Sequence, residues 1–66
     1  MEYYGKSERC RVRVIATTGW LAKYNGQECD ATFYDEGVNP QIDTEQLKPP
    51  LPRWQSTVPE NLERIK

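Results

Sequence analysis

Two segments of this chain alternate apolar and polar residues, and the charges that they carry are opposite in sign. Residues 9 to 15 read Arg-Cys-Arg-Val-Arg-Val-Ile, and residues 28 to 34 read Glu-Cys-Asp-Ala-Thr-Phe-Tyr. Because successive side chains of a strand point to opposite faces, each segment has one apolar face and one polar, largely charged face. Antiparallel pairing would bury the apolar faces together and set arginines against carboxylates on the outside. The pattern therefore predicts a mostly β fold.

Chain length and composition limit what such a sheet can become. With 66 residues, of which 36% are hydrophobic, the chain has room for one domain with a thin core. No run of about 18 apolar residues occurs, so no membrane partner is expected. The first residues, Met-Glu-Tyr-Tyr-Gly-Lys, lack the apolar centre of a secretory signal, which favours a cytoplasmic location.

The residue types needed for most catalytic and metal sites are scarce. The chain has no histidine and two cysteines, Cys10 and Cys29, which is too few nitrogen and sulfur ligands for a structural zinc ion. Both cysteines occupy inward positions of the proposed strands, and we expect them to act as reduced, small core residues, although the sequence leaves a disulfide open. The adjacent carboxylates Asp35 and Glu36 stand on a solvated turn, which does not suit acid–base catalysis. We therefore expect no catalytic residues, no metal and no cofactor.

Charge is unevenly distributed along the chain. Residues 1 to 26 carry five bases and two acids, whereas residues 27 to 47 carry six acids and no base. If the two strands pair, much of this charge cancels across the sheet, with each ion pair contributing only about 0.2 to 1 kcal/mol.

The connections between the strands read as tight turns and one short helix. Asn25-Gly26 favours a turn with positive φ directly before the second strand. Residues 38 to 42 read as a short third strand, and Pro40 marks it as an edge or a bulge because proline has no N–H donor. Asp43 is a candidate N-cap for one helical turn over residues 43 to 47.

The sequence becomes rich in proline after residue 48. The proline-rich stretch that follows predicts an extended arm, and Thr57 with Glu60 is expected to form a capping box. Val58, Leu62 and Ile65 then fall on one helical stripe, which predicts a short C-terminal helix. The expected organisation is a barrel over residues 1–48 and an arm over residues 49–66 that is not an independent domain.

Pro49 and Pro52 have the spacing of a PxxP ligand for a foreign SH3 domain. The basic residue that such ligands place beside the prolines is missing, because the two flanking positions hold Gln46 and Trp54. We therefore interpret the prolines as a stiff linker between the barrel and the terminal helix.

The strand pattern, the Asn-Gly turn and the segment Glu-Cys-Asp-Ala-Thr-Phe-Tyr-Asp-Glu-Gly make residues 8–48 similar to the small SH3-like barrels. This group includes KOW and Tudor modules and small accessory subunits of photosynthetic complexes. The resemblance implies an antiparallel barrel that binds protein or nucleic acid through its loops or an open face. A Tudor-type aromatic cage would use Asp35 or Glu36 with four aromatics, although core packing is the favoured interpretation of those rings. The four aromatics are Trp20, Tyr24, Phe33 and Tyr34.

These observations predict a non-catalytic protein-interaction module that acts as a small accessory subunit, adaptor or inhibitor of a larger protein. Aromatic and aliphatic side chains of the kind that anchor interfaces would form the contact. The predicted partner-binding residues are Trp20, Leu21, Tyr24, Tyr34, Leu51, Trp54, Leu62 and Ile65.

Two other interpretations use different surfaces. A nucleic-acid-binding barrel would use the basic side chains of the first strand and of the loop that follows it. A homo-oligomer would join copies through exposed strand edges or through the C-terminal arms. The candidate nucleic-acid-binding residues are Arg9, Arg11, Arg13 and Lys23.

Overall fold

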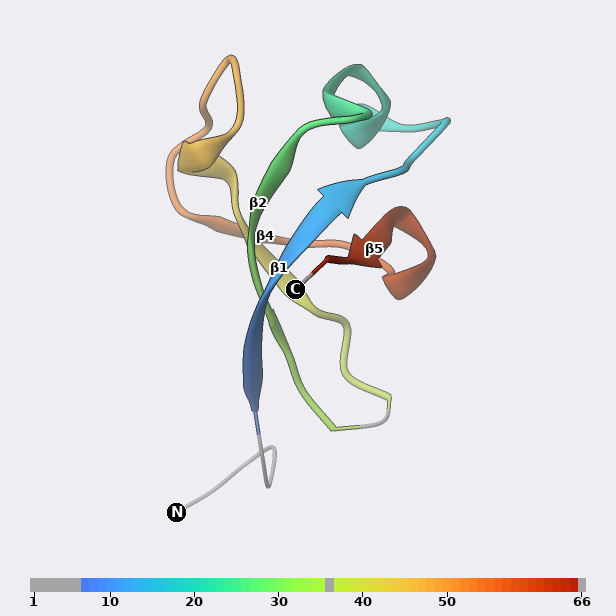
Figure 1. The fold of residues 1–66 in the computed structure, drawn as a ribbon, viewed down its shortest axis with the longest axis vertical. Helices are drawn as coiled ribbons and strands as arrows, with labels where there is room; N and C mark the ends of the chain where they lie inside the picture. Colours follow the sequence, from blue (N-terminus) through green and yellow to red (C-terminus); the bar gives the residue numbers. More distant parts are fainter. Residues whose placement is uncertain (1–6, 36, 66) are drawn as a thin grey trace.

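A computed structural model describes residues 7–35 and 37–65; residues 1–6, Glu36 and Lys66 lie outside the described residues. Five strands form one antiparallel sheet in the order β4-β3-β2-β1-β5, with short 3-10 helices between some of them (Figure 1). The elements are β1 Glu8–Val14, η1 Trp20–Tyr24, β2 Glu28–Phe33, β3 Gln41–Asp43, η2 Thr44–Gln46, β4 Trp54–Ser56, η3 Pro59–Asn61 and β5 Leu62–Arg64. The predicted mostly β fold is confirmed.

The predicted pairing of the two alternating segments is also confirmed. In the β1–β2 ladder Arg11 lies opposite Asp30, and Arg13 lies opposite Glu28. On the other face of β1, Val12 and Val14 are fully buried. The alternation therefore fixes both the face and the register, because a slip by one residue would turn the arginines into the core.

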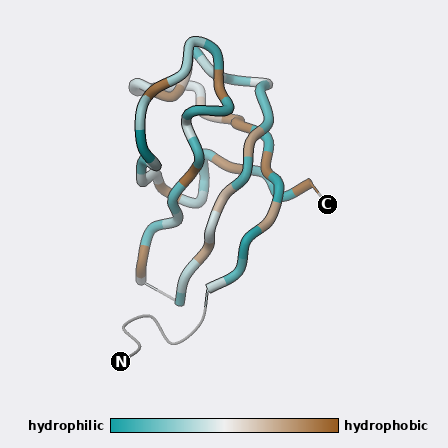
Figure 2. The backbone as a smooth tube through the Cα atoms, turned by 90° about the vertical axis from the view of Figure 1, so that its left-hand side faces the viewer, coloured by the Kyte–Doolittle hydropathy of each residue, from teal (hydrophilic) through white to brown (hydrophobic). Residues whose placement is uncertain are grey.

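The core lies on the inner face of the sheet and receives side chains from strands, turns and loops. Figure 2 shows hydrophilic and hydrophobic stretches alternating along the chain, which is typical of a sheet with one buried face. The largest fully buried hydrophobic side chains come from η1, from β3 and from the residue that follows η2, and are Tyr24, Leu21, Ile42 and Leu47. The buried hydrophobic residues are Val12, Val14, Ala16, Leu21, Tyr24, Cys29, Ala31, Ile42, Leu47 and Leu62.

The centre of the chain follows the sequence prediction with two differences. The third strand is predicted to be an edge or a bulge, but β3 is not an edge, because it pairs with both β2 and β4. The third strand is Gln41–Asp43, so Pro40 precedes it instead of interrupting it, and the Pro40 carbonyl accepts a 3.0 Å hydrogen bond from the Thr57 amide. The predicted helical turn is present as η2, and the Asp43 carboxylate accepts from the Glu45 amide as the predicted N-cap.

The prediction for the C-terminal segment is wrong in its secondary structure. Residues 49–66 contain two strands of the sheet, since β4 pairs with β3 and β5 pairs with β1. Within the described part of this segment, residues 49–65, Pro59–Asn61 is the one helical turn. Its N-cap is Val58 with no side-chain cap, so the predicted capping box of Thr57 and Glu60 is not formed. Leu62 points into the core, whereas Val58 is 43% exposed. A short isolated helix is marginal, and the strand instead satisfies backbone groups on the outer edge of β1.

The proline-rich stretch is a loop held against the body of the protein instead of an extended arm. The Gln27 side chain bonds both the amide and the carbonyl of Lys48, at 2.8 and 2.9 Å. The backbone carbonyl of Thr44 accepts a hydrogen bond from the Leu51 amide. The Thr44 hydroxyl donates a hydrogen bond to the Leu51 carbonyl oxygen at 3.0 Å. We call residues 48–53 the proline loop.

Candidate functional site

The arginines of β1 lie on the outer face of the sheet in contact with carboxylates. Arg11 bonds to Asp30 at 3.2 Å and to the side-chain oxygen of Gln46 at 2.9 Å. The Gln46 amide nitrogen in turn donates to Asp30 at 3.1 Å and to Asp43 at 3.0 Å. Hydrogen bonds from Gln46 and then from Arg11 hold the pKa of Asp30 below its ordinary value. This network connects three strands and η2.

The other two arginines of β1 are also engaged. Arg13 lies between Glu28 at 3.3 Å and Glu63 at 3.1 Å, and so connects β2, β1 and β5. Arg9 is 4.0 Å from Asp30, and its guanidinium lies 4.9 Å from the centre of the Trp54 ring. The face predicted for nucleic acid is therefore one on which carboxylates compensate the positive charge.

The residues predicted to bind a partner do not form one surface. Leu21, Tyr24 and Leu62 are buried in the core, and Leu51 packs against it. The side chains of Tyr34, Trp54 and Ile65 are half-buried. Of the eight predicted residues, Trp20 alone is a large exposed apolar side chain, at 46%. Sequence reasoning left out Ile15, which is 41% exposed, whereas Val58, which it placed on the apolar stripe of the C-terminal segment, is 43% exposed.

The helical turn η1 separates its residues into an inner and an outer side. A 3-10 helix has three residues per turn, so residues three apart lie on the same side. Leu21 and Tyr24 share the inner side and are buried, while Trp20 and Lys23 share the outer side and are exposed. Trp20 and Lys23 are therefore neighbours at the surface.

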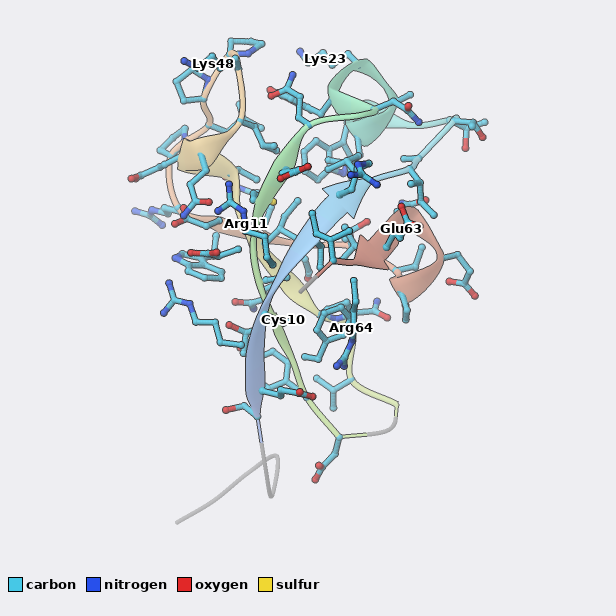
Figure 3. All side chains as sticks on the ribbon, viewed as in Figure 1. Cys10, Arg11, Lys23, Lys48, Glu63 and Arg64 are labelled. Atoms are coloured by element: carbon cyan, nitrogen blue, oxygen red, sulfur yellow. The ribbon has the colours of Figure 1, made fainter. Side chains whose placement is uncertain are left out.

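The ring of Tyr24 connects this turn to the proline loop. The Trp20 ring meets it edge to face, with centres 6.2 Å apart and planes at 74°. The Lys23 ammonium nitrogen lies 5.5 Å from the Tyr24 ring centre. The Tyr24 hydroxyl donates a 2.8 Å hydrogen bond to the carbonyl oxygen of Pro49. Figure 3 shows Lys23 and Lys48 at the same end of the molecule.

Charge compensation is uneven over the described residues. In residues 7–35 and 37–65 the cationic side chains without a carboxylate within 4.0 Å are Lys23, Lys48 and Arg53. Two of these three lie where η1 meets the proline loop (Figure 3). The exposed carboxylates of Asp35, Glu45 and Glu60 likewise have no described cation at ion-pair distance.

A cleft of about 360 Å³ lies at the other end of β2. Arg64 spans it, since its guanidinium is 3.0 Å from Glu8 and 4.2 Å from the centre of the Phe33 ring. Tyr34 and Asp35 also line the cleft. The aromatics considered for a cage are therefore divided between the two ends of β2, with Phe33 and Tyr34 at one end and the η1 rings at the other. They do not converge into a cage, which is the less favoured interpretation of these rings.

The two cysteines differ in their surroundings. Both are free, Cys10 half-buried and Cys29 buried, and burial raises the pKa of the Cys29 thiol to about 11. Cys10 lies opposite Ala31 and Cys29 opposite Val12, so the cysteines are diagonal neighbours. Diagonal Cα atoms are about 7 to 8 Å apart, beyond the usual range for a disulfide.

The described residues contain no group of three or more histidine, cysteine, aspartate or glutamate side chains placed to hold a metal ion. Across the same residues, no helix has both the length and the apolar character that a membrane crossing requires.

Comparison with known proteins gives no match: no protein-family model, no curated protein and no solved structure is similar to this chain. The function is therefore argued from the geometry of the site.

Proposed function

We propose that this protein is a non-catalytic interaction module, built as an SH3-like barrel, that acts as a small accessory subunit, adaptor or inhibitor of a larger protein. One observation carries the proposal: Trp20 is 46% exposed, yet its ring is held edge to face by the buried Tyr24. Tryptophan is enriched among residues that dominate binding energy, and a ring already held in place loses little conformational freedom on binding.

The sheet order supports the barrel part of the proposal. The chain's last described strand, β5, lies beside its first, and the short strands β4 and β5 form the two edges. Helical turns and loops cover the inner face, and side chains from η1 complete the core. Such a body presents its loops for binding, as the resemblance to SH3-like barrels implies.

Nucleic-acid binding through the β1 arginines is the weaker candidate. Phosphate contacts need several cations that are free to replace counterions. Arg11 and Arg13 each lie 3.3 Å or less from a carboxylate, so binding a phosphate would require breaking these contacts. Homo-oligomers formed through the β4 or β5 edge are a further possibility that sedimentation would detect directly.

The test is recovery of partners by the tagged protein from a native extract, with and without nuclease treatment. We expect one stoichiometric protein that survives nuclease and is lost with Trp20→Ala. Val58→Ala is the matched control, because it removes an apolar side chain of similar exposure elsewhere. Recovery that disappears with nuclease, and that depends on Arg11 and Arg13 instead of Trp20, would contradict the proposal.

A further inference from the structure

We propose that the end of the molecule where η1 meets the proline loop binds an acidic peptide segment that carries an apolar anchor residue. We call this surface the η1–loop surface; it consists of Trp20, Lys23, Lys48 and Pro49. The inference rests on the proposed function, because it names the chemistry of the partner that an interaction module of this kind would take.

The first step is that three of these residues, Trp20, Lys23 and Pro49, contact the buried side chain of Tyr24. Trp20 and Lys23 contact Tyr24 from the exposed side of η1, at 6.2 and 5.5 Å. The Tyr24 hydroxyl holds the carbonyl of Pro49 from the other side, at 2.8 Å. An exposed aromatic ring, a cation and a proline are thereby fixed close together by residues that are distant in sequence.

The second step is that the surface is already formed before a partner binds. Gln27 holds both backbone groups of Lys48, and Thr44 holds Leu51 further along the loop. Tyr24 is fully buried, so the ring on which Trp20 rests belongs to the core. A surface with this much fixed backbone loses little entropy when a ligand docks, which favours binding.

The third step is the charge of the surface. Elsewhere in the described residues the arginines of β1 and β5 are paired with carboxylates, but Lys23 and Lys48 are not. Two uncompensated ammonium groups beside an exposed tryptophan complement carboxylates that flank an apolar side chain. A lysine ammonium group can also bind a carboxylate in many orientations, so the partner's carboxylates need no single exact placement.

A peptide fits this surface better than a nucleic acid does. Trp20 could stack on a base, but a strand of phosphates needs a continuous row of cations, and the whole chain has a net charge of −1. An acidic peptide needs carboxylates only at the two lysines and one apolar side chain against Trp20. The chemistry of the surface therefore favours the peptide.

The experiment begins with selection from a random-peptide display library on the wild-type protein. We expect the selected peptides to share an aromatic or aliphatic residue flanked by aspartate or glutamate. One selected peptide, labelled with a fluorophore, is then used as the probe for affinity at low and high salt. Absence of any selected peptide, or selected peptides without acidic residues, would overturn the inference.

Variants of the η1–loop surface test which residues bind the probe. Trp20→Ala should weaken binding roughly thirtyfold, as expected for an interface anchor. Lys23→Ala with Lys48→Ala should weaken it roughly tenfold and reduce its dependence on salt. Arg9→Ala removes one positive charge from the sheet face, where 62% of the Arg9 side chain is exposed, and should leave affinity within about twofold. It is compared with Lys23→Ala and Lys48→Ala made singly, each of which also removes one positive charge. Lys23→Gln with Lys48→Gln repeats the test with longer side chains in case the alanines disturb the fold.

A direct readout comes from tryptophan emission in a Trp54→Phe protein, in which Trp20 is the one remaining tryptophan. The emission should shift to shorter wavelength when the acidic probe binds, because the exposed ring becomes covered. Probe binding that is unaffected by the lysine variants would overturn the acidic-peptide inference, although partner recovery through Trp20 would still support the proposed function. Equal binding of a single-stranded oligonucleotide through Trp20 would overturn both.

Discussion

The Tyr24 hydroxyl donates a hydrogen bond of 2.8 Å to the Pro49 carbonyl oxygen, which joins η1 to a loop 25 residues further along the chain. Tyr24 has no exposed surface, so one side chain serves both the core and the attachment of the proline loop. The position of the loop therefore depends on a core residue. A substitution that moves Tyr24 should also move the proline loop and so change the η1–loop surface.

Removing this hydrogen bond tests that relationship. Tyr24→Phe keeps the ring but leaves the Pro49 carbonyl without its partner, and we expect the free energy of unfolding to fall by about 1 kcal/mol. Urea unfolding followed by circular dichroism measures the change. The double variant with Gln27→Ala should lose less than the two single changes together, since both residues hold the same loop. Strict additivity would show that the two anchors act independently.

The core role of β5 is tested at Leu62, which is 8% exposed. Leu62→Ala should lower the free energy of unfolding by about 2 to 4 kcal/mol, because it removes buried methyl groups and leaves a cavity. Val58→Ala, four residues earlier and 43% exposed, should change it by less than about 0.5 kcal/mol. Thermal unfolding of both variants measures the contrast. Similar losses at the two positions would instead fit the helical stripe expected from the sequence.

The Asp30 network predicts how stability depends on pH. The folded pKa of Asp30 is lowered by Gln46 and Arg11, so the carboxylate favours the folded state at every pH above its ordinary pKa of about 3.9. That contribution is lost as pH falls through the lowered folded value. Urea unfolding between neutral pH and about pH 3 should show a decline that is smaller in Asp30→Asn. An identical pH profile in the variant would show that other carboxylates cause the decline.

The cysteines should react at very different rates. Burial raises the Cys29 pKa to about 11, so its thiolate is almost absent at neutral pH and its sulfur is covered as well. We expect iodoacetamide to modify Cys10 in the folded protein, and Cys29 only after urea is added. Mass spectrometry of digested peptides identifies the modified residue. Rapid modification of Cys29 in a Cys10→Ser protein without urea would show that the Cys29 sulfur is accessible in the folded protein.

The β1–β2 pairing could be predicted because its information is local and redundant. Hydrophobic alternation and charge sign both specify the same register, in which Arg11 meets Asp30. The C-terminal strand could not be predicted in this way. Leu62 at its start fits a helical stripe as well as a strand, and the choice is decided by the open edge of β1, where Arg13 contacts Glu63 50 residues away. The residues near Leu62 in the sequence carry no information about the open edge of β1.

The candidate site could likewise be predicted only in part from the sequence. The sequence indicated that Trp20, Leu21 and Tyr24 matter, but three apolar residues in a loop do not reveal which of them faces solvent. The three-residue repeat of η1 decides it, with Leu21 and Tyr24 inside and Trp20 outside. The position of Lys48 beside this turn depends on Gln27 and Tyr24, which bond to backbone carbonyls and therefore leave no signature in the residues that they hold.

The pairing of β1 with β5 has a consequence for how the protein is made. β5 is the last described strand and lies against the first, so the edge of β1 stays uncovered on the ribosome until residues 62–64 have left the exit tunnel. Until then the β1–β2 hairpin exposes its apolar face, and contacts between residues near the two ends of the described chain cannot form. We therefore expect the complete sheet to form only when Leu62–Arg64 is available to pair with β1, and a protein truncated before Leu62 to be cleaved by proteases faster than the full sequence.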